Sequence, residues 1–112
     1  MKYTCVDPSE YLYPDITAYK SSTDRIRILT PRNSFACAQI LLSEDEGAVD
    51  VVCEGWTPEV YEMVAIPVEE NILITDEVRT PYTPVRNAPF EVYDCLKPCD
   101  GSVTFQNGAA AV

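Results

Sequence analysis

The stretch Phe35–Leu42 reads FACAQILL and is apolar on both of the faces that a β-strand would present. Successive side chains of a strand point to opposite sides of the sheet. Alternate residues from Phe35 to Leu41 would therefore occupy one face, and those from Ala36 to Leu42 the other. Strands that are buried on both faces have this composition, so the run predicts a central strand with packing on each side.

Short strand-like runs lie on either side of this stretch. Arg25–Leu29 alternates Arg with Ile, which predicts a strand with Ile26 and Ile28 on one face. Asn107-Gly108 is the strongest hairpin signal in the chain, because both residues tolerate the positive φ of a tight turn. Further strands are expected at about 49–54, 59–68 (where Val60, Val64 and Ile66 would share a face), 71–75, 90–96, 102–106 and 109–112.

The chain has nine Pro residues, which leave little room for a long helix. About seven to eight short strands with frequent turns predict an all-β fold, an antiparallel β-sandwich. We expect the sandwich to be incomplete at its C-terminal end, since the apolar residues 109–112 look like a strand cut at its start. Residues 1–24, rich in Tyr, would be an N-terminal arm or covering strand, and residues 25–112 the truncated β-sandwich domain.

The composition limits the chemistry. Eight Lys and Arg against 18 Asp and Glu give a net charge of −10, which argues against nucleic acid and an anionic membrane as partners. The chain has no His, the usual general base and metal ligand. We therefore expect no catalytic residue, no metal and no cofactor. The five Cys and the lack of a visible signal peptide favour reduced thiols in the cytoplasm, and the C-x3-C spacing of Cys95 and Cys99 lacks the second pair of a zinc site.

Four residues are candidates for contact with a carbohydrate or with another domain. Trp56 lies in a turn-like stretch, where an indole can stack on a sugar ring, on the core or on a neighbouring domain. Arg79, Tyr82 and Arg86 lie in a Pro-rich polar loop at about 76–89. Loops on rigid scaffolds often carry binding residues.

Arg32 and Asn33 are interpreted as a structural corner. Asn tolerates positive φ in a tight turn, and Arg32 can pair with an acidic residue such as Asp50 or Asp94. Ligand contact is the alternative for this pair.

Two stretches resemble the N-terminal β-sandwich of glycoside hydrolase family 123 and its uncharacterised relatives. Leu29–Leu42 is similar to the family's "A-R-N-E, F-Q, apolar run" signature, although Ser34 replaces Glu and Ala38-Gln39 replaces Phe-Gln. Ala88–Pro98 is similar to its "A-P-F, V-Y-D, L-K-P" strand. In that family the catalytic adjacent Asp-Glu pair lies in a (β/α)8 barrel after the sandwich, so the resemblance implies a fragment without the catalytic barrel.

Three functions follow as hypotheses, and in none of them is this chain itself an enzyme. The first is a non-catalytic accessory module of a glycoside-hydrolase-like protein, with a catalytic barrel in the same polypeptide as its partner. The second is a free-standing carbohydrate-binding module. The third is a structural or adhesive β-sandwich protein that self-associates through an open sheet edge.

Overall fold

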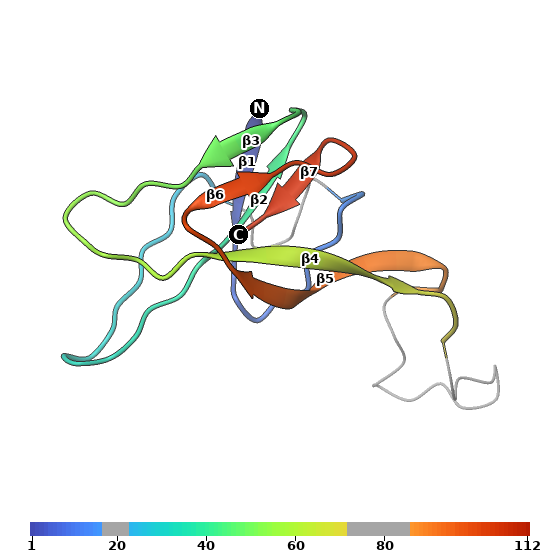
Figure 1. The fold of residues 1–112 in the computed structure, drawn as a ribbon. Coiled ribbons are helices and arrows are strands. Elements are labelled where there is room, and N and C mark those ends of the chain that lie inside the picture. Colours follow the sequence, from blue (N-terminus) through green and yellow to red (C-terminus); the bar gives the residue numbers. More distant parts are fainter. Residues whose placement is uncertain (17–22, 72–85) are drawn as a thin grey trace.

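The computed structural model describes residues 1–16, 23–71 and 86–112. Within these ranges the chain forms seven strands and no helix (Figure 1). The predicted all-β fold is therefore confirmed. The strands are β1 (Lys2–Val6), β2 (Gln39–Ser43), β3 (Ala48–Asp50), β4 (Tyr61–Val68), β5 (Phe90–Pro98), β6 (Ser102–Thr104) and β7 (Ala109–Ala111).

The strands pair antiparallel in three small sheets. β2 lies between β1 and β7, β3 pairs with β6, and β4 pairs with β5. The β4–β5 ribbon is the longest element and runs beneath the other strands in Figure 1. A sandwich of two facing sheets stays a prediction, since the hydrogen bonds group these strands into three sheets.

The central strand β2 packs on both faces, as its sequence predicts. Leu41 belongs to one buried cluster and its neighbour Leu42 to another. The first cluster also contains Val6, Leu12, Tyr93 and Ala111, and the second Val103 and Ala110. Because adjacent strand residues point to opposite sides, β2 separates a cluster against β1 and β5 from a cluster against β6.

The predicted central strand is too long at its N-terminal end, and the predicted strand Arg25–Leu29 is wrong. Residues 25–38 lie outside the strands, and Phe35 is 97 % exposed. A strand needs a neighbour to accept its N–H groups and donate to its carbonyls. No backbone hydrogen bond joins residues 25–38 to another described segment, so alternation alone does not make this stretch a strand.

The β4–β5 ribbon contains a bulge. Val64 pairs with Cys95 and Ala65 with Tyr93, which leaves Asp94 without a partner in β4. Met63 and Ala65 pack against the cluster that contains Tyr93. The face of β4 that packs on the core is therefore that of Met63 and Ala65. It is not the predicted face of Val60, Val64 and Ile66.

The hairpin at Asn107-Gly108 is confirmed. The two residues have φ values of 53° and 79°, as a type I′ turn requires. The backbones of Gln106 and Ala109 exchange two hydrogen bonds, at 2.8 and 3.1 Å. β6, before the turn, pairs with β3, and β7, after the turn, pairs with β2. The hairpin therefore links two of the sheets.

The N-terminal residues are part of the core. β1 pairs along its length with β2. Leu12 is 0 % exposed, and its carbonyl accepts a 2.9 Å hydrogen bond from the N–H of Tyr93. The side chain of Gln39 donates to the carbonyls of Asp7 and Glu10 and so ties the turn after β1 to β2. The predicted strand at 71–75 lies almost wholly outside the described residues.

Candidate functional site

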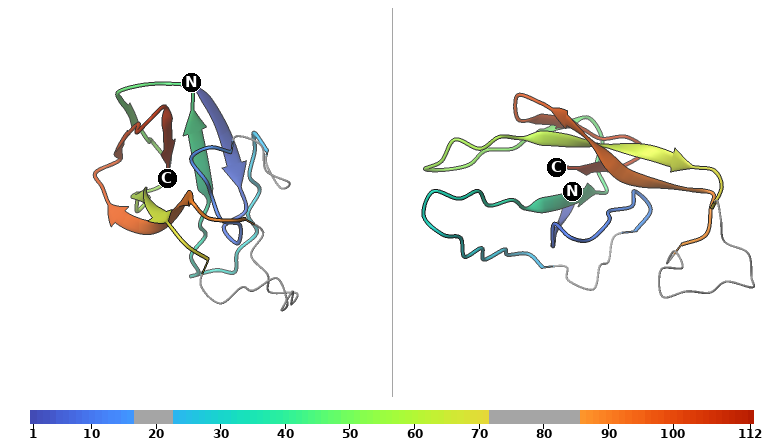
Figure 2. Two further views of the ribbon diagram at one scale, coloured as in Figure 1. Left: turned by 90° about the vertical axis from the view of Figure 1, so that its right-hand side faces the viewer. Right: turned by 90° about the horizontal axis from the view of Figure 1, so that it is seen from below.

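Two extended segments leave the sheets at one end of the molecule. The 25–38 segment leads into β2, and the 52–59 segment connects β3 to β4. Figures 1 and 2 show both projecting beyond the strands on the same side. Their backbones make no hydrogen bond with other described segments. The flanking residues Val51 and Val60 are held by backbone bonds to Gly101 and Cys99, so the second segment is anchored at both ends.

Large apolar side chains on these two segments are exposed. Leu29 is 99 % exposed, Val52 82 % and Trp56 81 %, in addition to Phe35. Single apolar residues on a surface are ordinary, but several on segments that project on the same side are typical of an interaction site. Of these four residues only Trp56 was predicted as a contact residue, because Leu29, Phe35 and Val52 lie in runs with the composition of strands. Pro31 to Asn33, the turn residues between Leu29 and Phe35, could have indicated that this stretch is not a strand.

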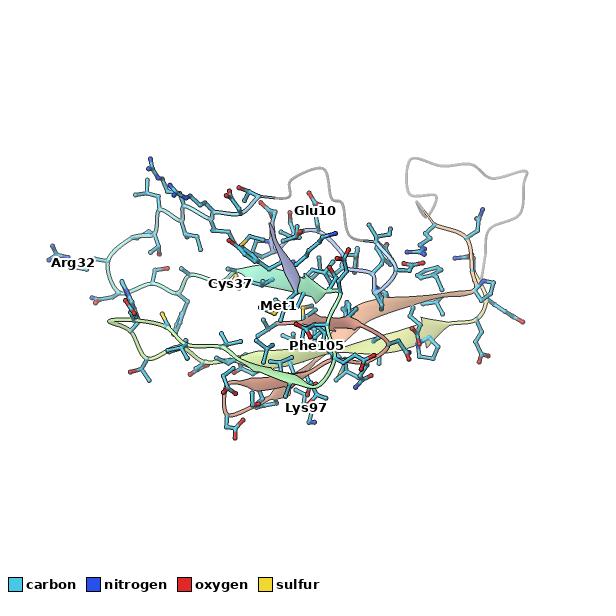
Figure 3. The ribbon with its side chains drawn as sticks, turned by 90° about the horizontal axis from the view of Figure 1, so that it is seen from above. Met1, Glu10, Arg32, Cys37, Lys97 and Phe105 are labelled. Carbon is cyan, nitrogen blue, oxygen red and sulfur yellow. The ribbon has the colours of Figure 1, made fainter. Side chains whose placement is uncertain are left out.

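The Arg32-Asn33 corner forms the far tip of the 25–38 segment. Asn33 has a φ of 59°, the left-handed conformation that Asn tolerates. Figure 3 shows Arg32 directed away from the sheets. Among the described residues it forms no ion pair, so the suggested pairing with Asp50 or Asp94 is not formed.

Arg86 is held by contacts within the chain. Its guanidinium lies over the rings of Tyr13 and Phe90, at 4.6 and 5.3 Å from their centroids, and forms an ion pair with Asp15. The two rings pack edge to face with centroids 5.8 Å apart. The cluster joins the N-terminal segment to the start of β5. The other two candidates in the Pro-rich loop, Arg79 and Tyr82, lie outside the described residues.

Trp56 and Arg86 lie at opposite ends of the β4–β5 ribbon. The 52–59 segment precedes β4, and Arg86 precedes β5. Because the strands are antiparallel, with Tyr61 opposite Pro98 and Val68 opposite Phe90, the starts of β4 and β5 are far apart. The predicted contact residues are therefore not brought together in one site.

The Asp15–Arg86 ion pair makes stability depend on pH. The hydrogen bond from Arg86 lowers the pKa of Asp15, so the pair stabilises the fold above the ordinary Asp pKa of about 4 and loses this effect as pH falls through the lowered value. We expect Asp15→Asn to lower the free energy of unfolding by up to about 1 kcal/mol at pH 7, since the carboxylate is largely exposed. The difference should vanish near pH 2, as measured by urea unfolding.

The control for this prediction is the same substitution in an Arg86→Gln background. Without the guanidinium, Asp15→Asn should leave the pH dependence of unfolding unchanged. A pH-dependent difference of equal size in both backgrounds would contradict the assignment of the effect to this ion pair.

A cavity of about 70 Å³ lies between the β4–β5 ribbon and the β6–β7 hairpin. Small-molecule sites usually measure roughly 300–1,000 Å³, so this cavity is too small for a drug-sized ligand. Glu62, one of its lining residues, has its carboxylate 3.4 Å from Lys97 Nζ. The described residues contain no cluster of side chains suited to a metal ion.

The cysteines are all free thiols, with Cys95 exposed and Cys99 partly buried. The Sγ of Cys99 lies 3.6 Å from the carbonyl oxygen of Val60. Burial, together with the nearby carboxylate of Asp24, raises the pKa of the Cys5 thiol. Within the described ranges no helical segment has the length and apolar character needed to cross a membrane.

No family model matches this chain, and comparisons with curated proteins and with solved structures gave no match. The resemblance to glycoside hydrolase family 123 therefore stays a prediction.

Proposed function

We propose that this chain is a non-catalytic β-module that packs against another protein domain through the 25–38 and 52–59 segments. The observation that carries the proposal is the exposure of Leu29, Phe35 and Trp56 on segments whose backbones form no hydrogen bond with other described parts of the chain. Removing one such side chain from water stabilises a complex by roughly 1.5–3 kcal/mol. A docked domain would cover these side chains together.

The partner domain that the resemblance implies is a catalytic barrel in the same polypeptide. In this arrangement the barrel carries the catalytic groups, and the β-module shapes or shields the rim of its cleft. The composition supports a scaffold role, because the chain has no His to act as a base at neutral pH.

A carbohydrate-binding module is the second candidate, and the exposed indole of Trp56 favours it. Sugar-binding sites use the flat face of an aromatic ring. The aliphatic side chains of Leu29 and Val52 on the same two segments suit an apolar protein surface better than a polar glycan. We therefore rank domain packing above sugar binding.

Trp56 is the only tryptophan, which makes its fluorescence a direct test. In the isolated chain we expect strong quenching by acrylamide, since the indole is 81 % exposed. In the natural full-length polypeptide, produced by heterologous expression, we expect at least a fivefold lower quenching constant for this residue. Fluorescence of other tryptophans is removed there by replacing them with Phe.

Phe35→Ser and Tyr11→Ser provide a matched pair of variants. Both residues are exposed aromatics, but Tyr11 lies outside the two segments. In the native polypeptide, Phe35→Ser should restore acrylamide access to Trp56, and Tyr11→Ser should not. Equal quenching of Trp56 in the isolated chain and in the native polypeptide would overturn domain packing. Protection of Trp56 by glycans in the isolated chain would favour the carbohydrate-binding module instead.

A further inference from the structure

The 25–38 segment differs in charge from the rest of the molecule. It contains Arg25, Arg27 and Arg32 and no acidic residue, in a chain whose net charge is −10. None of the three takes part in an ion pair among the described residues. Asp24, which precedes the segment, lies instead near Cys5 of β1. The segment therefore presents three guanidinium groups that have no ion-pair partner within residues 1–16, 23–71 and 86–112.

The first five residues of the segment have the sequence pattern of a strand but pair with no other described segment. Arg25 and Arg27 alternate with Ile26 and Ile28, and all four are exposed. Residues i and i+2 of a strand lie about 7 Å apart on one face. The N–H of Arg25 bonds to the nearby Thr23 Oγ1, and the backbone beyond it makes no bond to another described segment. These groups are available to an added strand.

We propose that Arg25–Leu29 binds an extended acidic–apolar strand of a partner protein by β-strand addition. Backbone hydrogen bonds would supply much of the affinity, and alternate side chains the specificity. Carboxylates at alternate positions of the added strand would face Arg25 and Arg27, and apolar residues would face Ile26 and Ile28. Arg pairs well with carboxylates because its planar guanidinium donates two parallel hydrogen bonds. The inference rests on the proposed function and names the chemistry of its partner.

Charge favours an acidic peptide over the other occupants. A second copy of this chain would bring together two molecules of charge −10, which repel each other. A nucleic acid is disfavoured because three Arg are few for the many charges of a phosphate backbone. An acidic strand meets the local positive charge instead, because the segment projects beyond the sheets (Figures 1 and 2) and salt screens charges beyond about 8 Å.

The test uses the full 112-residue chain and a synthetic peptide that alternates Glu with Val, with both ends blocked. Binding is measured by the fluorescence anisotropy of the labelled peptide, and amide hydrogen exchange reports on residues 25–29. We expect saturable binding that weakens with salt, together with protection of these amides. A peptide N-methylated on the edge that would pair should bind at least tenfold more weakly, because it cannot donate the backbone hydrogen bonds.

Charge variants identify the residues that bind. Arg25→Gln with Arg27→Gln should weaken binding by about fivefold, since exposed ion pairs each contribute a modest factor. Arg32→Gln, at the tip beyond the alternating stretch, is the control and should change affinity less than twofold. A peptide of the same composition with Glu and Val in scrambled order should bind at least fivefold more weakly.

Several results would overturn the inference. The first three are no binding of the peptide, equal affinity for the N-methylated and unmethylated peptides, and an Arg32→Gln effect as large as that of the Arg25/Arg27 variant. A single-stranded oligonucleotide of the same charge that binds more tightly than the peptide would also overturn it. So would a dimer in sedimentation that the Arg25/Arg27 variant abolishes. Failure here leaves the proposed function standing if Trp56 is still protected in the native polypeptide. If acrylamide quenches Trp56 as strongly in the native polypeptide as in the isolated chain while the peptide binds, the domain packing fails and the strand addition survives.

Discussion

Replacing Leu12 with Ala is expected to lower the free energy of unfolding by about 2–5 kcal/mol. Leu12 is fully buried and lies in the cluster with Val6, Leu41 and Tyr93. The cost has two parts, the lost transfer of the side chain from water and the cavity left behind. Since small domains are stabilised by only about 5–15 kcal/mol, this substitution alone should shift urea unfolding strongly. Far-ultraviolet circular dichroism is the suitable measurement.

Tyr11→Ala is the control for Leu12→Ala. Tyr11 is the preceding residue and is largely exposed, so its substitution should change the free energy of unfolding by less than about 0.5 kcal/mol. The comparison tests whether the N-terminal segment is part of the cooperative core. A Leu12→Ala variant as stable as the parent would mean that residues 7–12 detach without loss, as an independent arm would.

Replacing Leu41 with Ala is expected to cost a similar 2–5 kcal/mol, whereas Phe35→Ala should cost less than about 0.5 kcal/mol. Both residues belong to one apolar run in the sequence. Leu41 is buried in the central strand β2, and Phe35 is 97 % exposed on the 25–38 segment. Urea unfolding of both variants, followed by circular dichroism, measures where the packed part of the run begins.

A large loss of stability in Phe35→Ala would contradict this division, because it would place the ring in the core. Leu42→Ala extends the test to the other face of β2, where Leu42 packs with Val103 and Ala110. We expect a loss of about 2–5 kcal/mol there as well. If only one of the two substitutions, Leu41→Ala or Leu42→Ala, lowered the stability, only one face of β2 would be packed.

Trp56 was predicted as a candidate contact residue, whereas the exposure of Leu29 and Phe35 was not predicted. An indole between Gly55 and Pro58 suits a turn, and turns lie at the surface. Leu29 and Phe35 lie in runs with strand composition, and nothing in those runs shows that no neighbouring strand is present. Arg86 was a candidate for external contact because of its loop. Its stacking on Tyr13 depends on a residue that is distant in sequence, so only the fold reveals it.

The sequence by itself determined the all-β character, the packing of β2 on two faces and the hairpin at Asn107-Gly108. These features are local, because they depend on alternation, on Pro frequency and on residues that tolerate positive φ. The tertiary structure decided which strand-like runs find a partner. It left Arg25–Leu29 without a partner strand in the described part of the chain, and it placed the core face of β4 at Met63 and Ala65. Strand pairing is a contact between distant parts of the chain, so its outcome depends on which neighbours the fold supplies.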